Sequence, residues 1–186
     1  MIGFAMCGSF CTHKKAVEQL KALLAYGYEV QPIMSENVYS TDTYFGTCES
    51  LKTTVIQLCG RDIIHTVVDA EPLGPKISLE ALAICPCTGN TLAKMANGIT
   101  DTAVTMAAKA HLRCDRPMLI ALASNDAMSQ NLYSIATLVN RKSVYLLPMV
   151  QDDPRGKPHS LIADFTKMSE GYEAMTHGVQ LRPLFL

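Results

Sequence analysis

The sequence predicts an α/β protein, with a doubly wound, mostly parallel sheet that carries helices on both faces. Three observations predict this fold class. Short apolar runs without polar alternation, such as IGFAMC at 2–7 and ALAIC at 81–85, are typical of strands that are buried on both faces. Segments with apolar residues at helical spacing separate these runs. Each run ends in a turn rich in Gly, Ser, Thr and Asn, as expected where a strand leads into a helix.

The beginning of the chain predicts a strand, a helix and a second strand, which together form a βαβ unit. Residues 2–7 are the first strand. Apolar residues then recur at helical spacing over 13–26, with Thr12 as the expected N-cap and Gly27 as the end of the helix. Residues 28–34 (YEVQPIM) predict the second strand. A parallel crossover of this kind is right-handed.

The rest of the chain continues the alternation of strands and helices. We expect a helix at 47–58, followed by an ambiguous segment at 62–71 that suits a short strand and a loop. A strand at 81–85, helices at 91–97 and 101–112, a strand at 117–123 and a helix that ends near 139 come next. A strand at 143–147, a polar loop at 150–160 and final helices complete the chain. About five parallel strands in one domain over 1–186 define a Rossmann-like or flavodoxin-like arrangement.

The composition narrows the range of functions. Hydrophobic residues make up 48% and charged residues 18% of the 186 residues, and the formal net charge is −1, so we expect a compact protein that is not a general nucleic-acid binder. No apolar run approaches a membrane span, and the N-terminus lacks the features of a signal peptide. The seven cysteines are mostly in apolar segments, which indicates a reducing cytoplasm. Cys85 and Cys87 have no second ligand pair at zinc-site spacing, so we predict no metal site.

Polar turns follow the carboxyl ends of the predicted strands. A doubly wound sheet binds its ligands at this edge. The expected loops are Gly8–Thr12, Ser35–Thr41, Pro86–Thr91, Ser124–Met128 and Gln151–His159.

Two of these turns favour a phosphorylated ligand. Gly8-Ser9 opens onto a helix N-terminus, which attracts anions, although ordinary turn chemistry explains it equally well. GxGxxG and P-loop motifs are both absent. Ser9 and Ser35 together suit a terminal phosphate monoester such as that of FMN.

Thr88-Gly89-Asn90-Thr91 is the densest polar turn. One N-cap needs only one such residue, so the surplus favours a ligand over a cap. Ser124-Asn125-Asp126 fits a cap and a ligand site equally well.

The segment CPCTGNTLAKMANGITD at 85–101 resembles the PASANT motif of the flavin-dependent cysteine decarboxylases, and ALASNDAM at 121–128 is similar to their later Met-Asn motif. The resemblance implies FMN between these loops, in an oligomer such as a trimer. The implied cofactor-binding residues are Gly8, Ser9, Phe10, Ser35, Cys87, Thr88, Gly89, Asn90, Thr91, Ser124 and Asn125.

The chain departs from the decarboxylases at three positions. They carry a histidine near the segment that corresponds to 76–79, whereas this chain has none between Thr66 and Lys109. His65 comes too early unless the intervening loop folds back, and we interpret it as a surface or core residue. Ser124 replaces the Met of the Met-Asn pair, and Ser129 replaces a bulky aromatic residue. These differences argue against cysteine decarboxylation.

Four blocks, AEPLGPK at 70–76, TGNTLAKMAN at 88–97, SNDAMSQN at 124–131 and QDDPRGKPHSLIAD at 151–164, resemble the family of dipicolinate synthase B subunits. The resemblance implies that the chain forms dipicolinate from a tetrahydrodipicolinate precursor in the mother cell of a sporulating bacterium. It implies a partner, the A subunit of dipicolinate synthase, which would supply a nicotinamide cofactor such as NADP.

A dicarboxylate substrate needs cations, and the loop at 151–159 offers Arg155, Lys157 and His159, although these fit an ordinary solvated loop equally well. Asn90 and Asn125 are the candidate catalytic residues, because their amides can orient a ring or a carbonyl. No residue is an evident general base. The alternatives are an FMN-dependent decarboxylase and a non-catalytic protein that supports the A subunit.

Overall fold

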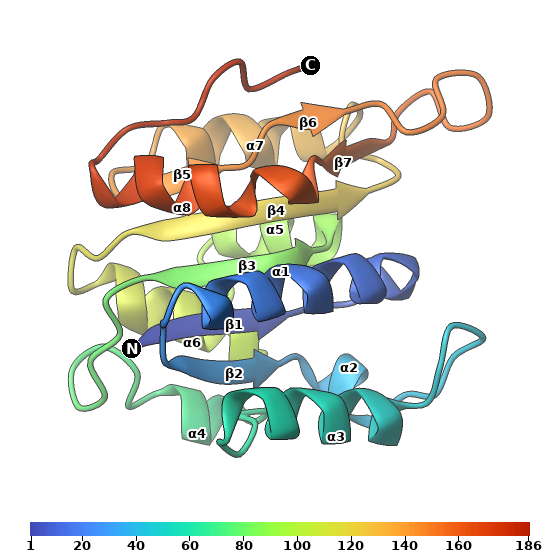
Figure 1. The fold of residues 1–186 in the computed structure, drawn as a ribbon. Coiled ribbons are helices and arrows are strands. Elements are labelled where there is room, and N and C mark those ends of the chain that lie inside the picture. The colour runs from blue at the N-terminus through green and yellow to red at the C-terminus, as the bar shows by residue number, and fades with distance from the viewer.

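Five parallel strands form the body of a seven-stranded sheet, in the order β2-β1-β3-β4-β5 (Figure 1). The structure is a computed structural model that describes residues 1–186. The order reverses between β1 and β3, which is the switch point of a doubly wound sheet. The predicted fold class is therefore confirmed. The strands are β1 (Ile2–Met6), β2 (Val30–Met34), β3 (Leu82–Cys87), β4 (Met118–Ser124) and β5 (Val144–Leu146).

Two short antiparallel strands, β6 (Met149–Val150) and β7 (Leu161–Ala163), extend the sheet. β7 pairs with the carboxyl end of β4, where Ala123 lies opposite Ile162. The sequence predicted a polar loop followed by helices in this region, and that prediction missed both strands. Strands of two and three residues are too short to show a periodic pattern, and only their pairing with β4 defines them.

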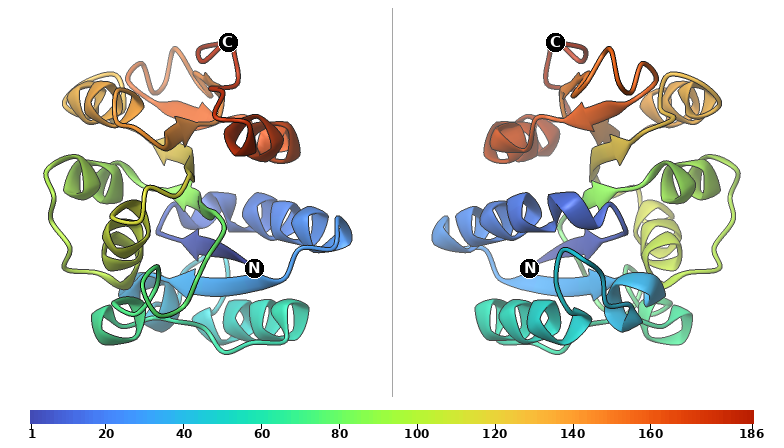
Figure 2. Two further views of the ribbon diagram at one scale, coloured as in Figure 1. Left: turned by 90° about the vertical axis from the view of Figure 1, so that its left-hand side faces the viewer. Right: turned by 90° about the vertical axis from the view of Figure 1, so that its right-hand side faces the viewer.

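Helices cover both faces of the sheet, as predicted (Figure 2). One face carries α1 (His13–Ala25), α3 (Cys48–Cys59) and α8 (Met168–Thr176). The other face carries α4 (Val67–Ala70), α5 (Gly89–Ala96), α6 (Ala103–Leu112) and α7 (Asn131–Val139). The short α2 (Glu36–Ser40) follows β2, and single 3₁₀ turns lie at Phe10–Thr12 and Phe165–Lys167. No helix is both long and apolar enough to cross a membrane.

The sheet separates two hydrophobic cores, because successive strand residues point to opposite faces. Phe4 and Met6 belong to a cluster of 24 buried residues under α1, α3 and α8. Ala5 and Cys7 belong to a cluster of 27 buried residues under α5, α6 and α7. The apolar runs in the sequence are continuous for this reason.

Helix α1 confirms the predicted spacing, with Ala16, Leu20 and Leu23 buried against the sheet. Its predicted cap is wrong in detail. Thr12 precedes the helix, but its hydroxyl caps no amide and donates instead to the carbonyl of Ser9 at 2.8 Å. The loop after β1 is therefore stabilised by a hydrogen bond within the loop, before α1 begins.

The ambiguous segment at 62–71 resolves into a bridge and a helix. Ile64 pairs in parallel with Ile33 at the edge of β2 and accepts a hydrogen bond from the amide of Met34. Helix α4 then begins after Thr66, whose side chain accepts from the amide of Asp69.

Candidate functional site

The loop after β1 is fastened to the carboxyl end of β4. Ser9 donates its hydroxyl hydrogen to the carbonyl of Ala123 at 2.8 Å, across the width of β3. Its backbone is left-handed, with φ 63°. Because the single hydroxyl hydrogen is directed at Ala123, the Ser9 side chain could offer an anion no donor in this arrangement. Only its backbone amide could do so.

The loop after β3 lies beside the loop after β1. A Cβ atom at Gly8 would lie 3.2 Å from Cγ2 of Thr88. Thr88 caps α5, because its hydroxyl oxygen accepts from the amide of Thr91 at 3.2 Å. The amides of Gly89 and Asn90 precede that capped amide and have no hydrogen-bond partner in the structure. The predicted turn is thus both a cap and a pair of unused donors.

The loops after β3 and β4 meet at Gly89. A side chain there would collide with three neighbours that surround the Cα atom, namely Ser124, Asp126 and Asn131. Ser124 donates to Oδ1 of Asp126, and Asn131 donates to Oδ2 of the same carboxylate at 2.9 Å. Oδ1 of Asn131 is buried without a partner. The carboxylate is therefore held from both sides.

Two members of this cluster, Asp126 and Asn131, are not among the predicted site residues. Asp126 adjoins the predicted pair Ser124-Asn125, so the polar turn itself was a signal for it. Asn131 closes the block at 124–131 and is the first residue of α7, and its amide reaches back five positions to Asp126.

The loop after β2 joins the same edge. The amide of Ser35 donates to the carbonyl of Met6, next to the loop after β1. The Ser35 hydroxyl oxygen accepts from the amide of Val38 at 3.4 Å, so its hydrogen remains free to donate to a ligand. The carboxylate of the next residue, Glu36, accepts from the amide of Ala103 at the start of α6, at 2.9 Å. Of the two predicted phosphate contacts, Ser35 is the one with a free hydroxyl donor.

Cys87 lies at the site, and its thiol is buried. The thiol donates to the carbonyl of Thr88 at 3.6 Å and lies beside the buried thiol of Cys7. Burial raises the pKa of Cys87 well above its ordinary value, whereas the hydrogen bond with Cys87 lowers the pKa of Cys7. Cys87 could therefore contact a ligand only through its backbone. Thr91 is likewise buried, with its hydroxyl bonded to Thr88 at 3.1 Å.

The two candidate catalytic amides are accessible. Asn90 and Asn125 are exposed, and neither side chain has a hydrogen-bond partner in the structure. They follow β3 and β4, whose ends are brought together at Gly89.

The loop with the candidate substrate residues is fixed beside them. The amide of Met128 donates to the carbonyl of His159 at 2.9 Å, which ties this loop to the loop after β4. Arg155 is exposed and unpaired, whereas Lys157 forms an ion pair with Asp152 at 3.1 Å. Half-exposed pairs of this kind are weak, so Lys157 could exchange its partner for a ligand carboxylate.

His65 does lie near the end of β2, because the segment that contains it folds back along that strand. It is half-buried, and its ring stacks on Tyr39 with centroids 3.6 Å apart and an interplanar angle of 8°. Lys52 lies over the Tyr39 ring at 4.5 Å. These contacts favour the interpretation of His65 as a packed residue.

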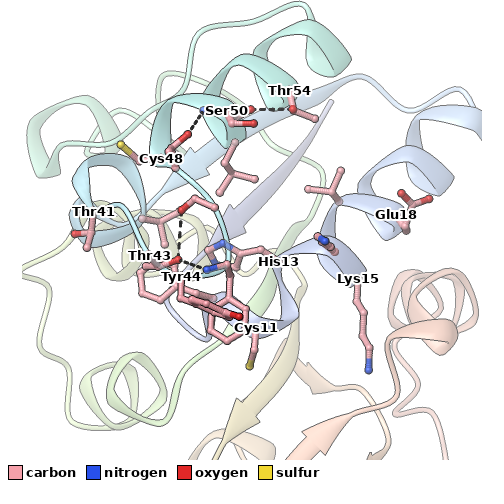
Figure 3. A pocket seen from close by; sticks show the side chains of 18 residues that line it. Cys11, His13, Lys15, Glu18, Thr41, Thr43, Tyr44, Cys48, Ser50 and Thr54 are labelled. Atoms are coloured by element: carbon pink, nitrogen blue, oxygen red, sulfur yellow. Dashed lines mark hydrogen bonds between the residues drawn. The ribbon is translucent and has the colours of Figure 1, made fainter.

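A cavity of about 830 Å³ opens beside these loops, between α1, α3 and the turn at 41–47 (Figure 3). Of the predicted cofactor residues, only Phe10 lines it. The cavity and the predicted cofactor loops are therefore neighbours rather than one site. The turn that closes the cavity carries no periodic signal in the sequence, which is why sequence reasoning did not find it.

The predicted loops suit FMN best if its ring and its phosphate bind at two separate places rather than in one anion pocket. Asp126 places a negative charge against the start of α5, which disfavours a phosphate there. An uncharged ring with carbonyl oxygens and an imide N–H fits the free amides of Gly89 and Asn90. Ser35 offers its free donor at the neighbouring strand end, where a phosphate would avoid Asp126. The residues present therefore fit the cofactor. No group of three or more His, Cys, Asp or Glu side chains converges to hold a metal ion.

Comparison with known proteins agrees with this geometry. The flavoprotein family matches residues 1–169. The dipicolinate synthase B subunit of Bacillus subtilis (strain 168) is 38% identical over 185 residues, which cover 100% of this chain and 92% of the relative. The crystal structure of the dipicolinate synthase B subunit from Bacillus halodurans superposes with a TM-score of 0.91 at 37% identity, covering 100% of this chain and 95% of that chain.

A more distant structure shares the fold. The crystal structure of an FMN-dependent cysteine decarboxylase superposes with a TM-score of 0.66 at 21% identity, over 95% of both chains. A doubly wound sheet with this strand order defines an α/β protein of the flavodoxin-like class. The chain belongs to the flavoprotein family and, within it, to the group of the dipicolinate synthase B subunits.

Proposed function

We propose that this chain is the FMN-binding component of a dipicolinate synthase. It would form dipicolinate from a tetrahydrodipicolinate precursor together with a separate A subunit. The observation that carries the proposal is the junction of the loops after β1, β2, β3 and β4, through Ser9–Ala123, Ser35–Met6 and Gly89–Ser124. The full-length similarity to dipicolinate synthase B subunits supports the choice of reaction.

The chain's own residues would bind and orient. Ser35 would donate to the phosphate of FMN, and the amides of Gly89 and Asn90 would donate to carbonyl oxygens of its ring. The side chains of Asn90 and Asn125 face the substrate and fix its ring or carbonyl by hydrogen bonds. When bound, FMN supplies the capacity to accept a hydride. Arg155 and Lys157 pair with substrate carboxylates, because an Arg fork matches a carboxylate in a bidentate manner.

The reaction would be shared between two different chains. This chain has no nicotinamide-type glycine loop, so NADP would enter with the A subunit. Such an enzyme acts in the cytoplasm of the mother cell during sporulation. It would assemble as a homo-oligomer, a trimer or a multiple of one.

The test is dipicolinate formation from the tetrahydrodipicolinate precursor, measured with each of the two proteins alone and with both. We expect efficient formation only from the mixture, and a purified chain that is yellow with flavin. Full activity from the isolated A subunit would make the function wrong. Changing Arg155 and Lys157 to Ala should mainly raise KM, by roughly ten- to a hundredfold, since one charge-assisted hydrogen bond contributes about 1.5–3 kcal/mol.

Two alternatives make different predictions in the same assay. An FMN-dependent decarboxylase would release CO₂ from a cysteine-type substrate without the A subunit. The packing of His65 against Tyr39 disfavours it, since His65 is the histidine nearest in sequence to the position of the decarboxylase histidine. A non-catalytic protein would be colourless and would still stimulate the A subunit.

A further inference from the structure

The cavity between α1 and α3 belongs to none of the roles assigned so far. Eighteen residues line its volume of about 830 Å³, which lies within the range of small-molecule sites. Figure 3 shows the cavity from close by, and its apolar lining includes Val17, Val38 and Leu51. Its rim comes from the start of α1 and from the turn at 41–47. A cavity of this size is large enough for a small ring compound.

The charge of the cavity wall is positive. Lys14 and Lys15 line the cavity, and neither forms an ion pair or a hydrogen bond in the structure. The one acidic side chain in the wall, Glu18, is paired with Lys21 at 2.8 Å. Figure 3 shows Lys15 at the edge of the cavity, extending away from the turn at 41–47. The uncompensated charge at this cavity is therefore that of two lysines.

These lysines occupy an unfavourable position in the helix. They are the second and third residues of α1, where the helix dipole disfavours positive charge. The first turn of α1 contains no acidic residue that would compensate them. Helix stability therefore gives no reason for two cations here, whereas binding of an anion would.

Aromatic and hydroxyl groups complete the wall. Phe10, Tyr44 and Phe45 line the cavity, and Phe10 packs on His13 with ring centroids 5.1 Å apart. Tyr44 and Phe45 are largely exposed, at 99% and 59%, so their faces are free to cover a ligand. The hydroxyls of Thr41, Tyr44 and Ser50 have no hydrogen-bond partner in the structure. Aromatic faces beside unused donors suit a planar ring with oxygen substituents.

We propose that this cavity binds a planar ring carboxylate, with Lys14 and Lys15 providing the positive charge and Phe10, Tyr44 and Phe45 covering the ring. The identity of the ligand as the dicarboxylate of the dipicolinate reaction rests on the proposed function. The location and the chemical class rest on the cavity itself.

The test is isothermal titration of the FMN-loaded chain with dipicolinate. Its uncharged analogue pyridine-2,6-dicarboxamide and inorganic phosphate serve as comparison ligands. The variant is Lys14→Gln/Lys15→Gln, and the matched control is Lys76→Gln/Lys109→Gln, which removes two other unpaired lysines that do not line the cavity. We expect dipicolinate to bind the control with the affinity of the wild type. It should bind the Lys14→Gln/Lys15→Gln variant at least about tenfold more weakly. The diamide should bind more weakly than dipicolinate to the wild type and equally to both variants.

Several outcomes would overturn the proposal. Unchanged dipicolinate affinity in the Lys14→Gln/Lys15→Gln variant would do so. Binding of phosphate as tight as that of dipicolinate would also overturn it. Loss of FMN from the variant would overturn it as well, because it would assign the cavity to the cofactor. Removing the lysines relieves the helix dipole, so the variant should unfold at the same temperature as the control or higher. Dipicolinate formation with the A subunit, measured separately, distinguishes failure of this site from failure of the proposed function.

Discussion

A Cβ atom on Gly89 would lie 2.7 Å from Oδ1 of Asp126, so the first residue of α5 and the loop after β4 leave no space for a side chain between them. The carboxylate cannot simply rotate away, because Asn131 holds its other oxygen at 2.9 Å. The junction of these two loops therefore depends on a glycine at 89. The proposed ring site is built on that junction.

Gly89→Ala should separate the two loops. Overpacking of a well-packed position typically costs about 1–3 kcal/mol, and we expect a loss of this size in the free energy of unfolding together with weaker FMN retention. The control is Gly156→Ala, at an exposed position where a Cβ would meet only the side chain of Asp153, which can move. Urea unfolding and flavin content after gel filtration measure both effects. Full retention of FMN in Gly89→Ala would show that the junction is not part of the cofactor site.

The sequence could predict the features that depend on a local pattern of residues, and not those that depend on contacts in the folded chain. The strands β1, β3 and β4 were predictable because burial on both faces requires an uninterrupted apolar run, as in residues 118–123. The turn at 88–91 was predictable because its polar residues exceed the need of one cap. Asn131 was not predicted as a site residue, because nothing in the sequence indicates that its amide turns back to the carboxylate of Asp126, five positions earlier. The hydroxyl direction of Ser9 was also not predictable, because its acceptor, Ala123, is 114 positions away.

Glu36 should act as a long-range cap. Its Oε1 accepts from the amide of Ala103 at 2.9 Å, so the loop after β2 satisfies a free amide at the start of α6. Glu36→Ala should lower the free energy of unfolding by about 1–2 kcal/mol, because it removes both the acceptor and a favourable charge at the helix N-terminus. Glu36→Gln keeps the acceptor, so its free energy of unfolding should decrease less. Equal stability of the wild type and Glu36→Ala in guanidinium unfolding would contradict this role.

His111 should make the protein less stable in acid. It is fully buried, its Nε2–H donates to the carbonyl of Pro117 at 2.9 Å, and burial lowers its pKa below the ordinary value of 6.5. Below about pH 6.5 the unfolded chain takes up a proton that the folded chain does not, so the free energy of unfolding decreases as the pH falls through this window.

The variant His111→Gln keeps an N–H donor and removes the titration. Its free energy of unfolding should fall less steeply with decreasing pH than that of the wild type. Some slope should remain, because burial also lowers the pKa of His13. His159→Gln, at an exposed position, serves as the control. Parallel pH profiles for the wild type and His111→Gln, measured by thermal unfolding, would rule out this contribution.

Ser35 and Ser9 should differ in their contribution to the cofactor. Ser35→Ala removes the free hydroxyl donor and should weaken FMN binding roughly tenfold, the effect of about 1.4 kcal/mol. It should change stability little, since its capping bond to the amide of Val38 is long at 3.4 Å. Ser9→Ala breaks the bond to Ala123 and should lower the free energy of unfolding by about 0.5–1.5 kcal/mol. The reverse pattern of affinities and stabilities would mean that the two serines have exchanged roles.

We propose that the edge formed by the loops after β1, β2, β3 and β4 binds FMN through both its ring and its phosphate. Flavin fluorescence, titrated with the purified chain, tests this directly when FMN is compared with riboflavin, which has the same ring and no phosphate. We expect saturable quenching of FMN and at least about tenfold weaker binding of riboflavin, since a charge-assisted phosphate contact is lost. Absence of FMN quenching, or equal affinity for the two flavins, would contradict it.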